Sequence, residues 1–270
     1  MDLSERQETY EKAYDHSIIA RIPVVIKLNI RGYQKITRNT KKPYCHRMLK
    51  AMSYAAMETI KEIEGAVFGY IFNDEIIFIL KNDQGIDTEP WFANKIQAIS
   101  SVTSSLITYN FQDYIYNNNY IPNLSGPVIF KGLSFAVPNI IEISNYLIYR
   151  QNACLINAVN SAIFHELSKN FNKKEVLEII NEKSISDRIE ILKNECEIEV
   201  DDYPSSFLRG VALYKIPKII EDQGVQKTKH RWSLDLSIPK FTEDTGFLFN
   251  IIMNGFDIFR PERDLPNNEE

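Results

Sequence analysis

The sequence lacks the features that mark several classes of protein. Its 270 residues include only three cysteines, Cys45, Cys154 and Cys196, and these form no CxxC pair. Such widely spaced thiols, with only four histidines, argue against a zinc cluster and fit free thiols in a reducing cytoplasm. No apolar run approaches the ~20 residues that a membrane-spanning helix needs. The charged residues 1–14 lack the apolar stretch of a signal peptide. We therefore expect a cytoplasmic protein without a membrane partner.

An excess of positive charge is also missing. The formal net charge is −5, whereas a strongly basic chain would point to nucleic-acid binding. Two local basic clusters remain, at residues 38–50 and 227–231. Such clusters are most often solvated surface, but they leave open the binding of a folded RNA. With 44% hydrophobic residues, the chain is long enough for one large globular domain or two small ones.

The first half of the chain predicts an alternation of strands and helices. We expect strands at 23–30, 66–72, 75–80 and 127–137, the last with a bulge at Gly132. A helix is expected at 43–63, with Pro43 in its first turn, and another at 90–116, beginning at Pro90. The order strand–helix–strand–strand–helix–strand is that of the ferredoxin-like fold. The predicted fold class is therefore α+β, with a palm-like βαββαβ domain.

The second half is expected to be mainly helical. Pro138 and Asn139 open a segment that runs through Tyr149, and helices are predicted at 150–168 and 173–181. A strand at 209–216 is expected to pair with residues 225–236 as a small hairpin. These patterns divide the chain into a palm-like domain at 1–137, a helical and β portion packed on it at 138–260, and a flexible tail at 261–270.

Polar residues that are suited to metal binding follow two of the predicted strands. The first strand ends at Asn29, and the hairpin turns at Asn73, Asp74 and Glu75. Since a ferredoxin-like sheet places its first strand beside this hairpin, we expect Asn29 and Asp74 to lie close together. Acids in this position let a polymerase-type palm hold two Mg²⁺ ions for phosphoryl transfer. The alternative is ordinary turn chemistry, for which Asn and Asp are equally suited.

A series of short segments carries a more specific signal. In chain order they are Asn29-Ile30-Arg31-Gly32-Tyr33, Lys42-Pro43, Gly69-Tyr70, Asn73-Asp74-Glu75, Arg150 to Asn157, Asp187 to Leu192, Arg209-Gly210, Arg231-Trp232 and Ile238-Pro239-Lys240-Phe241. Their order and spacing, over roughly residues 5–242, resemble the tRNA-histidine guanylyltransferase family and its bacterial and archaeal guanylyltransferase-like relatives. Those enzymes are similar to polymerase palms but extend RNA in the 3′-to-5′ direction.

The resemblance implies a nucleotidyltransferase with several partners. The expected cofactor is Mg²⁺ in a site of the two-ion type, and the expected substrate is a nucleoside triphosphate, GTP or ATP. The acceptor would be the 5′ end of a tRNA or another RNA. A homo-dimer or homo-tetramer is expected on the same ground.

The resemblance also implies roles for individual residues. Asp74 would be the main metal ligand and catalytic acid, assisted by Asn29, Glu75 and the backbone oxygen of Ile30. The candidates for binding the nucleotide are Lys42, Arg150, Lys27, Arg31, Asn73 and Asn157. A surface charge or a salt bridge is the alternative for each cation. The candidates for binding RNA are Lys227, Lys229, Arg231 and Trp232. Cys154 is interpreted as a core residue.

Several site positions depart from the family pattern. Asn29 stands where the family has an aspartate, and Leu155 stands where it has a histidine. Further departures are at Ile30, Cys45, Asn73 and Ala158. An amide brings no charge to Mg²⁺, which prefers carboxylates and phosphates. Two alternatives therefore stay open: a catalytically impaired relative that binds nucleotide or RNA, and a palm enzyme that acts on a different acceptor.

Overall fold

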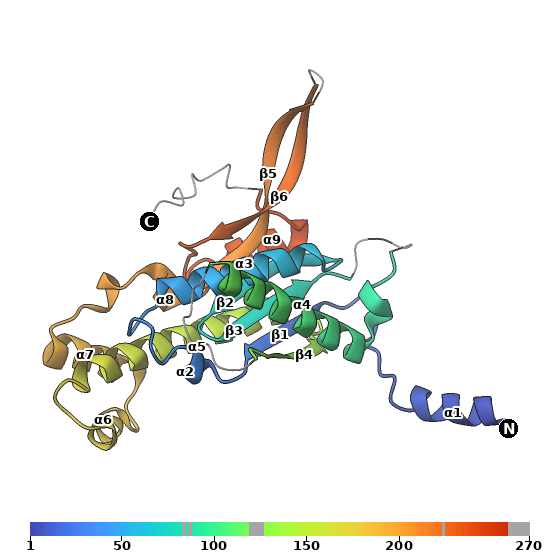
Figure 1. The fold of residues 1–270 in the computed structure, drawn as a ribbon. Coiled ribbons are helices and arrows are strands. Elements are labelled where there is room, and N and C mark those ends of the chain that lie inside the picture. The colour runs from blue at the N-terminus through green and yellow to red at the C-terminus, as the bar shows by residue number, and fades with distance from the viewer. Residues whose placement is uncertain (83–84, 86–87, 119–126, 223–224, 259–270) are drawn as a thin grey trace.

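The protein is built on one antiparallel sheet of six strands. The structure, a computed structural model, describes residues 1–82, 85, 88–118, 127–222 and 225–258. Within these residues the strand order is β4-β1-β3-β2-β5-β6 (Figure 1). The strands are β1 (Val24–Ile30), β2 (Ala66–Phe72), β3 (Glu75–Leu80), β4 (Phe130–Ala136), β5 (Val211–Asp222) and β6 (Val225–Asp235).

Helices cover both faces of this sheet. On one face lie α3 (His46–Lys61) and α4 (Ile96–Asn117), and on the other lie α5 (Ile140–Leu167) and α9 (Thr245–Asn254) (Figure 1). Each face therefore has its own apolar core. Strands β2 and β3 are buried at every position because they lie between these two cores. The predicted βαββαβ order is confirmed, and the hairpin strands begin and end at the predicted residues.

Three details of the first half differ from the prediction. Pro43 precedes α3, which begins at His46. Pro90 precedes a short 3₁₀ segment, η1 (Trp91–Asn94), so that α4 begins only at Ile96. The register between β1 and β4 runs without a shift, so there is no bulge at Gly132. A Cβ at Gly132 would lie 2.5 Å from Ser104 Oγ, and this glycine instead allows α4 to approach β4 closely.

The second half contributes both helices and strands. The predicted segment and helix at 138–168 form one helix, α5, of 28 residues. The predicted helix at 173–181 is α6 (Lys173–Ile180), which packs with α7 (Ile185–Cys196) against the end of α5. The remaining helical segments are short, except for α1: α1 (Leu3–Lys12), α2 (Tyr33–Ile36), η2 (Val200–Asp202) and α8 (Ser205–Arg209). Among the described residues, no helix combines the length and the apolar character needed to cross a membrane.

The C-terminal hairpin is longer than predicted and belongs to the palm sheet. Strand β5 extends to Asp222, and its first residues pair with β2. Beyond β2, strands β5 and β6 continue as a two-stranded ribbon that projects from the body (Figure 1). The domain boundary at residue 137 stays a prediction, although strands from both sides of it share one sheet. The predicted tail at 261–270 lies outside the described residues.

Candidate active site

The end of β1 meets the turn between β2 and β3. Asn29 lies opposite Glu75 in the β1–β3 ladder. The backbone N–H of Ile30 donates a hydrogen bond to the carbonyl of Asp74, at 3.0 Å. Asn73 has a φ of 48°, a left-handed conformation that asparagine tolerates in turns. The expected proximity of Asn29 to the hairpin acids is therefore present in the structure.

The two acids of the hairpin lie in different surroundings. Asp74 occupies the turn and is half-buried, whereas Glu75 is the first residue of β3 and its side chain is only 4% exposed. Glu75 faces α5, as do Lys27 and Asn29 from β1. Alternation along a strand explains this separation, because successive side chains point to opposite faces.

Both carboxylate oxygens of Glu75 are occupied by protein donors. Arg150 donates from Nε to Oε1 at 2.7 Å and from Nη2 to Oε2 at 2.9 Å. Lys27 Nζ lies 2.9 Å from Oε2, and Asn29 Nδ2 donates to the same oxygen at 3.3 Å. These four residues are referred to below as the Glu75 cluster. A carboxylate this deeply buried is stable only when it is paired and hydrogen-bonded.

The cluster changes the roles expected for three residues. Glu75 was predicted to bind metal, but its oxygens are filled. Lys27 and Arg150 were predicted to bind phosphate, but here they neutralise Glu75. Arg150 also packs against the rings of Phe72 and Tyr149, with its guanidinium carbon 5.4 and 5.0 Å from the ring centroids. The structure thus supports a positioning role for this pair, which fixes α5 on the sheet.

The carboxylate of Asp74 is not paired with a cation among the described residues. Within the described part of the chain it makes no salt bridge. Burial raises the pKa of Asp74, and the negative charge of Glu75 acts in the same direction. A backbone hydrogen bond and the charges of Lys27 and Arg150 oppose this increase in pKa. Burial is also the main cause of a raised pKa at Tyr33, to which the charge of Asp74 adds.

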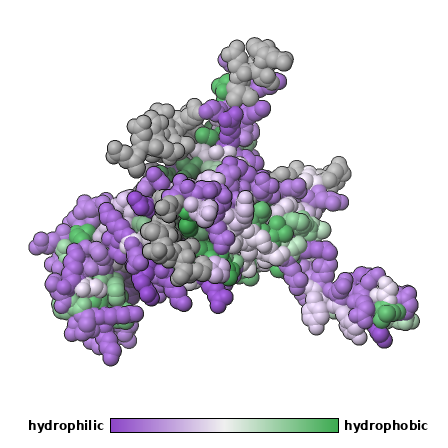
Figure 2. All heavy atoms as spheres, in the orientation of Figure 1, coloured by the Kyte–Doolittle hydropathy of each residue, from purple (hydrophilic) through white to green (hydrophobic). Residues whose placement is uncertain are grey.

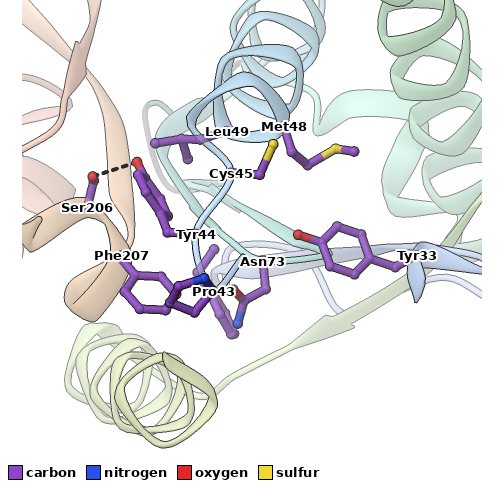
Figure 3. Close-up of a pocket in the computed structure, with 10 residues that line it drawn as sticks. Tyr33, Pro43, Tyr44, Cys45, Met48, Leu49, Asn73, Ser206 and Phe207 are labelled. Atoms are coloured by element: carbon purple, nitrogen blue, oxygen red, sulfur yellow. Dashed lines mark hydrogen bonds between the residues drawn. The ribbon is translucent and has the colours of Figure 1, made fainter. Parts of the chain in front are cut away.

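An open pocket lies beside the β2–β3 turn, and Asn73, the neighbour of Asp74, lines it. Its lining is mainly aromatic and apolar: Tyr33, Pro43, Tyr44, Cys45, Met48, Leu49, Phe72, Asn73, Ser206 and Phe207. Figure 3 shows Pro43, Tyr44 and Phe207 on one side of Asn73 and Tyr33 on the other. The hydroxyls of Tyr44 and Ser206 are 3.0 Å apart, and the rings of Tyr44 and Phe207 are 5.2 Å apart. The pocket therefore combines aromatic and apolar side chains with a few polar groups, as small-molecule sites do.

Sequence reasoning identified only part of this pocket. Asn73 lines it, and Lys42 is exposed at its edge, next to Pro43. Tyr33 is the last residue of the recognised segment that begins at Asn29, and Tyr44 directly follows Lys42-Pro43, so both could have been proposed from the sequence. Ser206 and Phe207 belong to the short helix α8, far along the chain, and carry no signal of their own.

Other predicted residues do not line the pocket. Arg31 is exposed just after β1, and its backbone N–H donates to Ile129 at 2.8 Å. The side chain of Ile30 is buried in the core, and the proposed metal contact through its backbone oxygen stays a prediction. Asn157 is exposed on α5, two turns beyond Arg150. Cys154 is buried, as predicted, and burial raises the pKa of its thiol to about 12.

The residues present do not fit a two-ion magnesium site. Such a site requires several carboxylates around the ions. Over the described ranges, no group of three or more His, Cys, Asp or Glu side chains converges. Glu75 is occupied, and Asn29 directs its N–H toward Glu75. Asp74 alone offers an open carboxylate at this end of the sheet.

The predicted RNA-binding residues separate onto two faces of the ribbon. Lys227, Lys229 and Arg231 alternate along β6 and so share one face. Lys218 of β5 lies opposite Lys229 and joins them. Together these four residues are referred to as the cation stripe. Figure 2 shows hydrophilic residues along this projecting ribbon.

Trp232 does not belong to the cation stripe. It lies on the other face of β6, where Lys215 Nζ is 5.0 Å from its ring centroid. Trp232 also packs against the core on the α3 and α4 side. Trp232 is therefore separated from the three cations proposed to bind RNA with it, because neighbouring residues of a strand point in opposite directions.

A family profile and a curated relative both match this chain, and both are described as tRNA(His) guanylyltransferases. A profile described as tRNAHis guanylyltransferase matches residues 4–138, half of the chain. A probable tRNA(His) guanylyltransferase of Dictyostelium discoideum is 25% identical over 235 residues, covering 82% of this chain and 88% of that protein.

Solved structures share the fold. A bacterial tRNA(His) guanylyltransferase-like protein in complex with ATP superposes with a TM-score of 0.78 at 24% identity, covering 93% of this chain and 99% of that one. A bacterial protein of the same description in complex with GTP gives a TM-score of 0.72 at 22% identity, covering 93% and 98%. At these identities the likeness shows a common architecture.

Proposed function

Since the chain belongs to the tRNAHis guanylyltransferase family, we propose that it binds a nucleoside triphosphate beside Asp74 and transfers a nucleotide to the 5′ end of a tRNA. The single observation that carries this proposal is the pocket at the β2–β3 turn, which adjoins the carboxylate of Asp74. The relative named above is a probable tRNA(His) guanylyltransferase, and the similar structures hold ATP or GTP.

The pocket receives the base of the nucleotide. Its half-buried aromatic wall, Tyr44, offers a face on which a purine stacks, and stacking of this kind contributes ~1–3 kcal/mol per base. The exposed cations Lys42 and Arg31 then contact the triphosphate. Any Mg²⁺ would come as the counter-ion of the triphosphate, with Asp74 as its single open protein carboxylate. The base preference, GTP or ATP, is part of this proposal.

The acceptor RNA contacts the projecting ribbon. Lys229 and Arg231 of the cation stripe present positive charges at the spacing of alternate strand residues, on an extension that no helix covers in the described structure. Contacts of this kind bind the phosphate backbone and do not read sequence. We also place the protein in the cytoplasm as a homo-dimer or homo-tetramer, on the strength of the family alone.

A second candidate function is nucleotide or RNA binding without transfer. The observation that favours it is the amide of Asn29, which donates to Glu75 and leaves the site with one open carboxylate. Transfer to another acceptor is a third candidate, supported by Leu155, which stands where the family has a histidine.

A 5′-end labelling assay separates these candidates. The protein is incubated with each labelled nucleoside triphosphate and with tRNA that lacks its first nucleotide. Label on the tRNA that disappears in Asp74→Ala, but persists in the exposed control Asp201→Ala, supports transfer to tRNA. Nucleotide binding without label on the tRNA supports the second candidate. A labelled product that forms when RNA is omitted identifies another acceptor.

A further inference from the structure

The Glu75 cluster satisfies every oxygen of its carboxylate without a metal ion. Oε1 accepts one hydrogen bond from Arg150, and Oε2 accepts from Arg150, Lys27 and Asn29, at distances of 2.7 to 3.3 Å. Two cations face one carboxylate, so the cluster carries a net positive charge of one. A buried site of this charge has no need of a further cation.

The identity of residue 29 decides this balance. The Nδ2 of Asn29 is a donor, and it lies 3.3 Å from a carboxylate oxygen. An aspartate in this place would put an acceptor with a negative charge against Glu75 Oε2. Two carboxylates at hydrogen-bond distance would share the positive charges of Lys27 and Arg150, so the cluster would lose its surplus positive charge. With Asp74 near by, an aspartate would also bring the net charge of this end of the sheet to minus one.

We propose that Asn29 makes the active-site end of the palm independent of a divalent ion, both for its folded stability and for binding the nucleoside triphosphate. Asn29 acts here as a positioning residue, because its amide completes the shell around Glu75. Lys27 and Arg150 supply the positive charge that a metal ion would otherwise bring to this part of the sheet. The part concerning the triphosphate rests on the proposed function, whereas the part concerning stability does not.

Thermal unfolding and nucleotide binding, each measured in EDTA and in Mg²⁺, test this inference. We compare the natural sequence with Asn29→Asp, and use Asn172→Asp as a matched control. Asn172 caps α6 through its side-chain oxygen, and aspartate caps a helix equally well. The control therefore adds the same charge far from the Glu75 cluster.

The natural protein and the control should unfold at the same temperature in both conditions. Asn29→Asp should unfold about 2–4 °C lower in EDTA, the shift that about 1 kcal/mol causes in a larger chain, and should recover in Mg²⁺. The natural protein should bind ATP or GTP with an affinity that changes less than about threefold on removing Mg²⁺, whereas Asn29→Asp should lose about tenfold, equivalent to ~1.4 kcal/mol.

A charge exchange provides the decisive second variant. In Asn29→Asp combined with Glu75→Gln, an amide again faces a carboxylate, with the two groups in exchanged positions. This double variant should lose the dependence on Mg²⁺ that Asn29→Asp shows. The inference is overturned if the double variant stays dependent, if Asn29→Asp unfolds alike in EDTA and Mg²⁺, or if the natural protein itself loses stability in EDTA. If no variant binds either nucleotide in Mg²⁺, the proposed function fails, while the unfolding temperatures still decide the role of Asn29.

Discussion

Arg150 of α5 holds Glu75 of β3 through two parallel hydrogen bonds, between residues that are 75 positions apart in the chain. This bidentate pair joins the second half of the protein to the end of the palm sheet that carries the proposed active site. It is nearly buried, with the Arg150 and Glu75 side chains 12% and 4% exposed. Lys27 approaches the same carboxylate from β1. These three residues therefore connect β1, β3 and α5 at the proposed site.

Removing one partner of this pair should strongly destabilise the protein. We expect Arg150→Ala to lower the free energy of unfolding by about 3–5 kcal/mol, because it leaves Glu75 buried with less compensation. Urea denaturation measures this loss. The exposed pair of Lys12 and Glu8 is the control, since Lys12→Ala should cost less than about 1 kcal/mol. A similar small effect for both variants would show that the buried pair is unimportant for stability.

The raised pKa of Asp74 makes a prediction about pH. Burial raises this pKa above its ordinary value of 3.8, so the folded state binds a proton more tightly than the unfolded state. The contribution of Asp74 to stability is therefore greatest at low pH, and decreases as pH rises from about 3.8 through the folded pKa. The Asp74→Asn variant cannot ionise at this position and so avoids this loss of stability. It should therefore unfold at a higher temperature than the natural protein at pH 7.

The advantage of Asp74→Asn should shrink as the pH falls to 3.8 and below, because Asp74 becomes protonated first in the folded state and then in the unfolded state. Unfolding temperatures of the two proteins, measured side by side from pH 7 downwards, test this. Glu75, Lys27 and Arg150 influence Asp74 but are present in both proteins, so the difference isolates residue 74. A difference that grows towards low pH would contradict the assigned direction of the pKa.

Gly132 should not tolerate a side chain. A Cβ there would lie 2.5 Å from Ser104 Oγ and 2.9 Å from the Ser100 carbonyl, so α4 would have to move away from β4. We expect Gly132→Ala to cost about 1–3 kcal/mol, which is typical of overpacking. Gly246→Ala in α9 is the control: its nearest neighbour would be at 3.5 Å, and alanine favours a helix. Denaturation that affects both variants equally would contradict this explanation of Gly132.

The ring of Tyr44 should contribute to nucleotide affinity. Tyr44→Leu removes the face on which a base is proposed to stack, and an affinity loss of about 5- to 150-fold corresponds to ~1–3 kcal/mol. Equilibrium binding of ATP and GTP measures the loss. Tyr109→Leu, at a position that is exposed on α4, should bind both nucleotides as the natural protein does. Unchanged affinity in Tyr44→Leu would place the base elsewhere.

The cation stripe should govern the salt dependence of tRNA binding. Changing Lys229 and Arg231 together to alanine should weaken binding and reduce the slope of log K against log salt by about one per cation. Trp232→Ala should lower stability, because this ring packs on the core, and should leave the slope unchanged. Titrations with tRNA at several salt concentrations distinguish these effects. A change in slope for Trp232→Ala alone would reverse the assignment of the two ribbon faces.

Much of the fold could be predicted from the sequence because it depends on local patterns. The apolar hairpin strands on either side of Asn73 and Asp74 fix β2 and β3 at their observed residues. Boundaries near prolines were less predictable: Pro43 and Pro90 lie just outside the helices that they were expected to begin. The close packing at Gly132 was mistaken for a bulge, because a glycine in a strand fits both explanations.

By itself, the sequence determined the order of strands and helices, the meeting of Asn29 with the hairpin acids, and the burial of Cys154. Only the tertiary structure decided which side chains pair there. Lys27 and Arg150 are cations that suit a phosphate or a carboxylate equally well. Both pair with Glu75, because an unpaired charge buried between sheet and helix would be strongly destabilising. The pocket wall from Phe207 and the separation of Trp232 from its basic neighbours likewise depend on long-range packing and strand register, which no local pattern encodes.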